Sequence, residues 1–274
     1  HAKYAVADDR ALVLTENWKP AGTGGRENRG WGVRMDSPAA ATDLAALFGR
    51  DFGARDARPW AAVRRNRSFE SGGAADGSYP SRVDPARVHP RRVRVLTAPG
   101  NAERAVVGVV DGADRRVDVL QPTLGGPDVP FVRAVVRAAE RGVRVRILLS
   151  GAWYVEEENR KLVAGLNRRA ARRDLPLTAR IAEPNGRYGA IHAKGLIADD
   201  VVVVGSLNWD DVSARENREV DVALDGGGAA RYYRRVFAAD WRGGPRLPPA
   251  GLALAAALAV GVALAYLRRR VRFA

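Results

Sequence analysis

The chain has 274 residues, with 45 Lys and Arg against 31 Asp and Glu, which gives a formal net charge of +14. It has no cysteine, which excludes disulfides and thiol catalysis, and its three histidines leave few ligands for a metal site. A hydrophobic content of 46% is enough for a sizeable core in one or two domains. The charge is carried mostly by arginine, which suits phosphate recognition, although a GC-rich genome explains the use of arginine over lysine equally well.

The chain begins with a predicted hairpin that gathers polar side chains on one surface. Residues two apart in a strand project from the same face, so His1 and Lys3 share a face, as do Thr15 and Asn17. Asp8 falls at the turn, where aspartate is favoured, and we expect it to act through hydrogen bonds. A helix is then predicted over 38–52.

Residues 57–91 are predicted to form a flexible connector. The stretch 61–91 is rich in Arg, Gly, Ser and Pro, which is typical of a linker. His89 lies within it, between Val88 and Pro90, and we expect it to be exposed to solvent and without a role.

The following segment alternates strands and helices. Strands are predicted over 93–98, 116–120, 143–149, 177–182 and 220–224, and helices over 101–110, 130–141, 155–173 and 229–241. This alternation predicts an α/β fold in which helices cover a sheet.

A second predicted hairpin, with strands over 190–198 and 201–207, repeats the polar residues of the first. The offset is a constant 191: His192, Lys194, Asp199, Ser206, Asn208 and Trp209 stand where the first copy has His1, Lys3, Asp8, Thr15, Asn17 and Trp18. The two tryptophans are expected to pack. Repeats kept for packing reproduce apolar positions, whereas this one reproduces polar positions, so we interpret it as a repeated functional site.

Two such sets of polar side chains, facing one centre, would suit the binding and cleavage of a phosphodiester. Imidazole acts as a nucleophile or general acid near neutral pH, and ammonium, hydroxyl and amide groups donate to anionic oxygens. We expect His1 and His192 to converge, one attacking phosphorus and the other protonating the leaving oxygen. The remaining donors would hold the substrate oxygens, namely Lys3, Lys194, Asn17, Asn208, Thr15 and Ser206. This chemistry requires no metal ion and no cofactor.

The duplicated H-x-K-x-x-x-x-D, with Gly205-Ser206-Leu207-Asn208 after the second copy, resembles the phospholipase D superfamily over roughly residues 1–55 and 92–243. The resemblance implies two similar α/β lobes about a pseudo-twofold axis, with the active site between them. It also implies metal-independent cleavage or transfer of phosphodiesters through a covalent phosphohistidine.

A second repeated block follows each hairpin, Glu27-Asn28-Arg29-Gly30 and Glu216-Asn217-Arg218-Glu219. The resemblance implies that an acidic residue at the position of Glu219 orients the motif histidine. We therefore expect Glu219 to orient His192, while Gly30 offers His1 nothing unless Glu27 substitutes. Because a carboxylate stabilises the imidazolium formed during reaction, this favours His192 as the nucleophile.

The segment Leu247–Leu267 carries no charge and is predicted to span a membrane. At about 1.5 Å per residue it reaches roughly 30 Å, the thickness of the hydrocarbon core. Four arginines follow within 268–272, which places this tail in the cytoplasm and the catalytic lobes outside. A tail-anchored protein with cytoplasmic lobes is the alternative.

We expect four parts: the C-terminal half of a first lobe (1–56), the connector (57–91), a second lobe (92–245), and a transmembrane helix with its basic tail (246–274). About a hundred residues precede His192 in its lobe and none precede His1. The first lobe is therefore expected to lack its leading half, and the chain to be a fragment of a longer protein or a cropped one.

The predicted function is a membrane-anchored phosphodiesterase of phospholipase D type, acting on phospholipids. One alternative is a nuclease of the same superfamily, which the positive charge favours and the aromatic content of only 7% does not. The other alternative is a catalytically inactive, membrane-anchored binding module.

Overall fold

A seven-stranded mixed sheet forms the centre of the protein in a computed structural model, which describes residues 1–23, 28–63, 83–183 and 188–243. Neighbouring strands are antiparallel from β5 to β6, and β6, β7 and β8 are parallel. In spatial order the strands are β5 (Arg92–Ala98), β12 (Glu219–Asp225), β11 (Val201–Gly205), β10 (Gly195–Ala198), β6 (Arg116–Gln121), β7 (Arg144–Ser150) and β8 (Leu177–Ala182).

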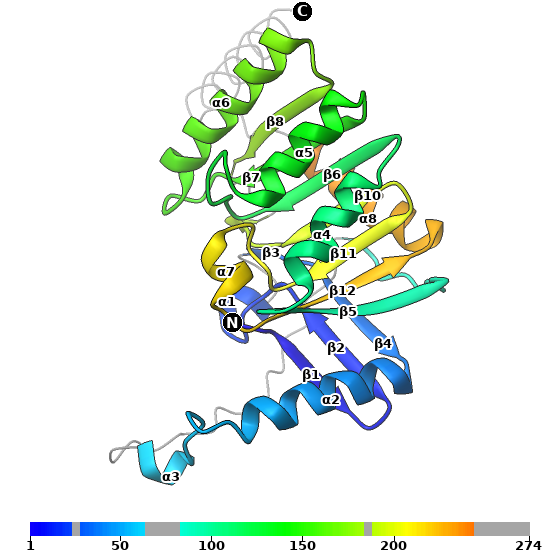
Figure 1. Cartoon of the computed structure of the whole chain (residues 1–274), viewed down its shortest axis with the longest axis vertical. Helices are drawn as coiled ribbons and strands as arrows, with labels where there is room; N and C mark the ends of the chain where they lie inside the picture. Colours follow the sequence, from blue (N-terminus) through cyan, green and yellow to red (C-terminus); the bar gives the residue numbers. More distant parts are fainter. Residues whose placement is uncertain (24–27, 64–82, 184–187, 244–274) are drawn as a thin grey trace, which may run out of the picture.

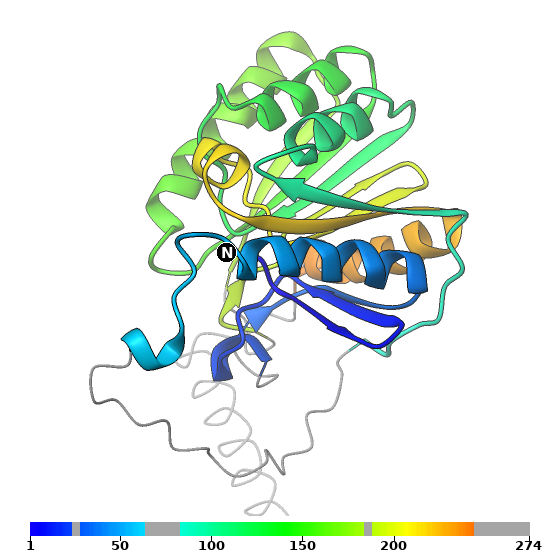
Figure 2. The ribbon, with the colours of Figure 1, turned by 60° about the horizontal axis from the view of Figure 1, so that its bottom comes forward.

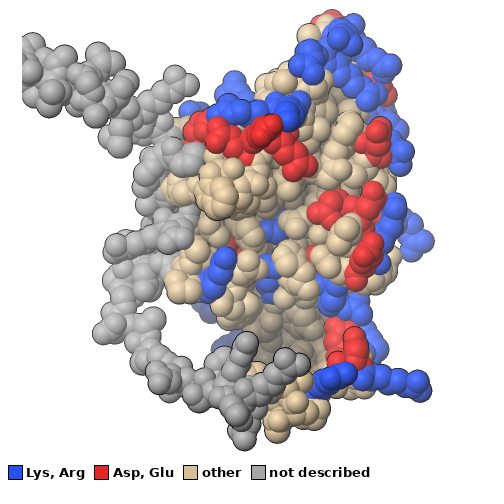
Figure 3. All heavy atoms as spheres, turned by 90° about the vertical axis from the view of Figure 1, so that its left-hand side faces the viewer, with Lys and Arg blue, Asp and Glu red and all other residues tan. Residues whose placement is uncertain are grey.

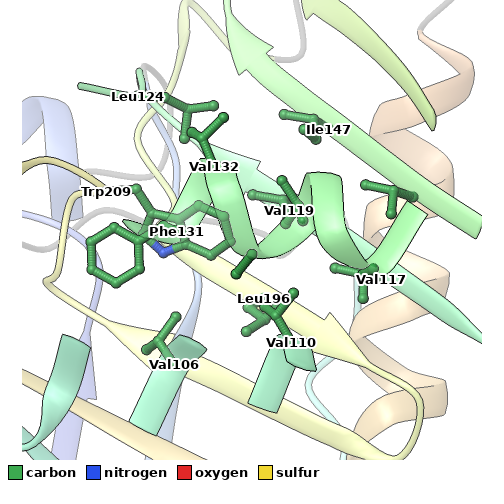
Figure 4. Packing of buried hydrophobic residues seen from close by; sticks show 14 of the residues in the cluster. Val106, Val110, Val117, Val119, Leu124, Phe131, Val132, Ile147, Leu196 and Trp209 are labelled. Atoms are coloured by element: carbon green, nitrogen blue, oxygen red, sulfur yellow. The ribbon is translucent and has the colours of Figure 1, made fainter. Parts of the chain in front are cut away.

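One face of this sheet is covered by α4 (Ala102–Asp111), α5 (Pro130–Glu140) and α6 (Glu156–Arg173), with the short α7 (Asp211–Arg215) beside them (Figure 1). The apolar residues of α5 recur at helical spacing, so Phe131, Val132 and Val135 are fully buried against the strands. Figure 4 shows Phe131 beside Trp209, with ring centroids 5.4 Å apart. The prediction of an α/β sheet covered by helices is confirmed.

The opposite face is covered by α2 (Pro38–Phe52), α8 (Gly227–Arg242) and a three-stranded antiparallel sheet of β1 (Tyr4–Ala7), β2 (Arg10–Leu14) and β4 (Gly32–Asp36) (Figure 2). Helix α2 begins after Ser37, whose hydroxyl accepts a hydrogen bond from the Ala40 N–H (3.4 Å). Leu44 of α2 and Phe237 of α8 are fully buried in this second core.

Two short strands join segments that are far apart in sequence. β3 (Asn28–Arg29) pairs in parallel with β9 (Ala190–Ile191), which places the residues before His192 against the block that follows the first hairpin. Two further helices are single turns, α1 (Pro20–Thr23) and α3 (Trp60–Val63).

The hairpin that carries His192 differs from its predicted form. The expected strand over 190–198 is interrupted between β9 and β10. The interruption arises because β9 leaves the large sheet: the N–H groups of His192 and Ala193 donate to the Arg29 carbonyl (3.0 and 2.9 Å). The histidine and lysine thus lie on irregular backbone rather than on a continuous strand.

The predicted connector is only partly described. Helix α3 lies within it, and Val83 and Val88 are partly buried against the second core, so its last residues belong to the folded structure. His89 is exposed, as expected. Residues 64–82 lie outside the described residues.

Within the described ranges, no helix has both the length and the apolar character needed to cross a membrane. The predicted span Leu247–Leu267 lies outside those ranges. The expectation that both motif tryptophans pack holds for Trp209, whereas Trp18 is 59% exposed and that half of the prediction is wrong.

Candidate active site

Each of the two motifs docks on the other half of the chain. The His192 N–H donates to the Arg29 carbonyl (3.0 Å), and the backbone nitrogen of His1 donates to the Arg218 carbonyl (2.8 Å). Arg29 and Arg218 hold the same position in the two repeated blocks. The backbone of each motif histidine is therefore held by the repeated block that follows the other hairpin.

Both motif lysines are buried next to their histidines. Lys3 Nζ donates to the His1 carbonyl, and Lys194 Nζ donates to the His192 carbonyl (2.8 Å). Lys194 Nζ also lies 3.2 Å from His192 Nδ1 and 3.5 Å from the Thr15 carbonyl, so the second lysine reaches the first hairpin.

Burial governs the charge of these lysines. It lowers the pKa of Lys3 to about 8 and the pKa of Lys194 to about 7, although the negative charges of Glu16 and Glu219 act against it. The same two carboxylates bear on both lysines, so the two motifs share one electrostatic environment.

Glu219 pairs with the histidine of the other motif. His1 Nδ1 lies 2.8 and 3.0 Å from the two carboxylate oxygens of Glu219. The prediction that Glu219 orients His192 is therefore wrong, because Glu219 adjoins Arg218, on whose carbonyl His1 docks. Burial raises the pKa of Glu219, against a hydrogen bond with Ser206 and the charge of Lys3.

A second carboxylate, which the sequence interpretation missed, stands at the other histidine. Glu16 Oε2 lies 3.3 Å from His192 Nδ1 and accepts a hydrogen bond from Asn28 Nδ2 (3.0 Å). The available signal was the repeat itself, since Glu16 is acidic where the second copy has Leu207. Glu27, considered as a substitute carboxylate, lies outside the described residues.

The motif asparagines, Asn17 and Asn208, are half-buried at the ends of their hairpins. The side-chain oxygen of Asn208 is buried and has no hydrogen-bond partner among the described residues. A role for both asparagines in holding substrate oxygens stays a prediction.

The motif hydroxyls occupy equivalent buried positions. Thr15 Oγ1 accepts a hydrogen bond from the Trp31 N–H (2.9 Å), and Ser206 Oγ accepts one from the Val220 N–H (3.0 Å). Neither residue is exposed. In this arrangement both hydroxyls hold the neighbouring backbone, and their predicted contact with substrate remains a prediction.

The motif aspartates lie at the hairpin turns, away from the histidines. Asp199 is separated from Lys194 by the whole of β10, and its carboxylate accepts hydrogen bonds from the N–H groups of Asp114 (2.8 Å) and Arg116 (3.0 Å). Burial would raise the pKa of Asp199, but these hydrogen bonds outweigh it and lower that pKa. Asp8 holds the matching turn and is exposed. The structure does not bring either carboxylate to the imidazoles.

Asp221 is a further buried carboxylate that sequence reasoning passed over. It lies within β12, 2% exposed, and Oδ1 accepts from the Leu207 N–H (3.3 Å). Burial, together with the nearby charge of Glu219, raises the pKa of Asp221 to about 7. An aspartate between two valines, Val220 and Val222, was the signal that could have revealed it.

The cluster presents two imidazoles, each with a carboxylate at Nδ1, beside two buried ammonium groups. With a carboxylate at Nδ1, Nε2 of each ring is the atom that would meet a substrate, and at His192 the Lys194 Nζ lies 3.3 Å from that atom. Such a pair can supply a nucleophile and a general acid. No group of three or more His, Cys, Asp or Glu side chains in the described part of the chain is arranged to hold a metal ion.

Residues 106–241 match the domain family described as "Cardiolipin synthase, PLD-like domain". Among curated proteins, none is significantly similar to this chain in sequence. The chain resembles the crystal structure of phosphatidylserine synthase from Haemophilus influenzae Rd KW20, at 13% identity and a TM-score of 0.60, over 88% of this chain and 62% of that one. It also resembles Nuc from Salmonella typhimurium, described as a phospholipase D family member, at 22% identity and a TM-score of 0.46, over 58% of this chain and 99% of that one. At such identity the likeness to the synthase shows a shared fold.

Proposed function

From the premise that residues 106–241 form a phospholipase D-like domain, we propose that the chain is a phosphodiesterase that works through a phosphohistidine intermediate. The observation that carries the proposal is the crosswise pairing of both motif histidines with buried carboxylates, His1 with Glu219 and His192 with Glu16. A carboxylate at Nδ1 orients the ring and stabilises the imidazolium form, which a nucleophile and a general acid both need.

In the first step, Nε2 of one histidine attacks phosphorus and the bond to the leaving oxygen breaks. The other histidine donates its Nε2 proton to that oxygen, so an alcohol departs and a phosphohistidine remains. In the second step, water or an acceptor alcohol gives its proton to the second histidine and attacks phosphorus, which breaks the phosphorus–nitrogen bond. Lys3 and Lys194 would balance the charge on the non-bridging oxygens, assisted by Asn17 and Asn208.

The pairing of both histidines with carboxylates removes the reason to favour His192 as the nucleophile. The expectation for His192 depended on Glu219, but each histidine has its own carboxylate, at 2.8 Å for His1 and 3.3 Å for His192. Rapid quenching of a slow phosphodiester substrate, followed by mapping of the phosphoryl adduct, assigns the role to one ring.

The substrate class that we propose is phospholipid. The supporting features are the uncharged segment Leu247–Leu267, which would hold the active site near lipid head groups, and the fold shared with a phosphatidylserine synthase. We also propose that residues 1–56 are the C-terminal half of a first lobe related to the second lobe, 92–245. The order β1–β2–β4 followed by α2 matches the order β10–β11–β12 followed by α8, which supports this division.

The test is hydrolysis and transfer of vesicle phospholipids by the full chain, beside a parallel assay on single-stranded DNA. We expect turnover of the lipid, and replacement of His1 or His192 by Asn to lower kcat by about 10³-fold or more, because each removes a reacting group. His89→Asn is the matched control, since His89 is exposed in the connector, and it should retain full activity. Cleavage of DNA alone would establish the nuclease, and no turnover of either substrate would favour a binding module.

A further inference from the structure

We infer that Glu16 is the positioning residue for His192, and that it supplies from a different place in the sequence what Glu219 supplies to His1. The catalytic meaning of this inference depends on the proposed function, whereas its geometry stands on contacts between named atoms.

The two histidine–carboxylate pairs have the same supporting residue. Asn217 Nδ2 donates to Glu219 (3.5 Å), which meets His1, and Asn28 Nδ2 donates to Glu16 (3.0 Å), which meets His192. The asparagines hold the same position in the two repeated blocks, at an offset of 189. The unit of asparagine, carboxylate and imidazole is therefore present twice, although only the asparagine and the histidine are repeated in sequence.

In the first block Gly30 stands at the position that Glu219 holds in the second. The side chain of Glu16 occupies the space beside Gly30. A Cβ placed on Gly30 would lie 2.3 Å from Glu16 Cγ and 2.5 Å from Glu16 Oε1. The φ angle of Gly30 is not in the left-handed region, so its backbone does not require glycine. Glycine is needed at this position for space, and the side chain that uses the space is a carboxylate.

The second copy shows the reverse arrangement. The equivalent of Glu16 is Leu207, which is buried in the first hydrophobic core, and there the block ends in Glu219. In the first half, the hairpin ends with Glu16 and the repeated block ends with Gly30. In the second half, the hairpin position holds Leu207 and the block ends with Glu219. One carboxylate per histidine results in both cases.

One oxygen of the Glu16 carboxylate, Oε2, meets both His192 and Asn28. It is 6% exposed, and its Oε1 has no hydrogen-bond partner among the described residues. The charged groups that face it are the ammonium groups of Lys3 and Lys194. Burying a carboxylate costs free energy unless it is compensated, so a buried carboxylate with one oxygen unpaired suggests a functional reason for its presence.

The test gives the first half of the chain the carboxylate position that the second half has. Glu16→Leu copies the second half at the hairpin and removes the carboxylate. Gly30→Glu in the Glu16→Leu background then restores a carboxylate at the position of Glu219, in the space that Glu16 vacates. Gly30→Glu alone places two side chains in one space and completes a double-mutant cycle.

Two quantities are measured in each variant of the full chain. The first is kcat on the vesicle phospholipid, which we expect Glu16→Leu to lower on the order of 100-fold with KM little changed, and the double variant to recover to within about 10-fold of the original value. The second is the ring-nitrogen spectrum of ¹⁵N-labelled histidine, which is simple because the chain has only three histidines. Nδ1–H should be the single tautomer of His192 in the original chain, mixed in Glu16→Leu and single again in the double variant.

The two readouts separate the inference from the proposed function. If the original chain has no turnover, the proposed function fails, while the tautomer of His192 still tests the inference. An unchanged tautomer and unchanged kcat in a folded Glu16→Leu variant would overturn the inference, as would a folded double variant that recovers neither. A thermal midpoint lowered in Glu16→Leu with kcat retained would assign Glu16 a structural role instead.

Discussion

Asp221 illustrates how the site keeps ionisable groups out of water. It lies near the charges of Lys194 and Glu219. One of its oxygens accepts a hydrogen bond from the Leu207 N–H, and the other has no hydrogen-bond partner in the described ranges. Burial disfavours the charged form of this carboxyl group relative to the protonated form. The pKa of Asp221 therefore rises from 3.8 to about 7.

This shift predicts a pH-dependent cost to stability. Between about pH 4 and 7 the folded chain binds a proton at Asp221 that the unfolded chain releases, so the free energy of unfolding falls as pH rises through that window. Relative to Asp221→Asn, which cannot titrate, the original chain should lose on the order of 2–4 kcal/mol between pH 4 and pH 8. Urea unfolding at both pH values measures the difference, with the exposed Asp9→Asn as control. Parallel pH dependence in the original chain and Asp221→Asn would contradict the prediction.

At the level of elements, an aromatic side chain of the first half packs directly on β10. Gly195, the first residue of β10, faces the ring of Trp31, which precedes β4 and packs on Tyr233 of α8 at 4.8 Å between centroids. A Cβ on Gly195 would lie 2.2 Å from Trp31 Cζ3. The absence of a side chain at this position lets the indole pack against the strand that follows Lys194.

Gly195→Ala should therefore destabilise the protein by about 1–3 kcal/mol, because the rigid indole and the strand cannot both keep their places. Gly108→Ala is a matched control in α4, where an added Cβ has nothing within 4 Å, and it should be neutral or stabilising by up to about 1 kcal/mol. Thermal unfolding of both variants distinguishes the two. Equal midpoints would contradict this prediction.

Elements whose residues repeat with a clear period could be predicted from sequence, and those that depend on distant partners could not. α2 and β8 have the predicted bounds because the apolar periodicity and the Pro38 start are local signals. β3 and β9 are two residues each and exist only because they pair with each other. The same reason explains the error at Glu219: the repeat identified the histidines and lysines, but not which half supplies each carboxylate.

Across the whole molecule, the positive charge is unevenly distributed. Figure 3 shows Lys and Arg gathered at the end where α6 lies, and the second half of that helix carries Arg168, Arg169, Arg172 and Arg173. Arg169 and Arg173 also meet Glu140, at 3.5 and 2.7 Å. Part of this arginine cluster is therefore paired with a carboxylate, and the net charge of +14 does not by itself indicate a nucleic-acid substrate.

The proposed anchor makes a prediction for the chain in its membrane. Because Leu247–Leu267 is followed by a basic tail, we expect the lobes outside and the tail in the cytoplasm. Protease added to intact cells should digest the lobes and spare an epitope placed after Ala274. Lobes that stay protected until the membrane is permeabilised would instead support the tail-anchored arrangement.

Crosswise pairing has a consequence for how such a site originates. A single copy of the repeat holds a histidine and a carboxylate that serve different rings, so it is incomplete as a catalyst until a second copy meets it, in the same chain or in another. When the copies belong to separate identical molecules, one sequence has to satisfy both roles at once. Fusion into one chain removes that symmetry requirement, and each carboxylate is then free to change position independently. The two halves of this chain differ in that way, with Glu16 and Gly30 in one and Leu207 and Glu219 in the other.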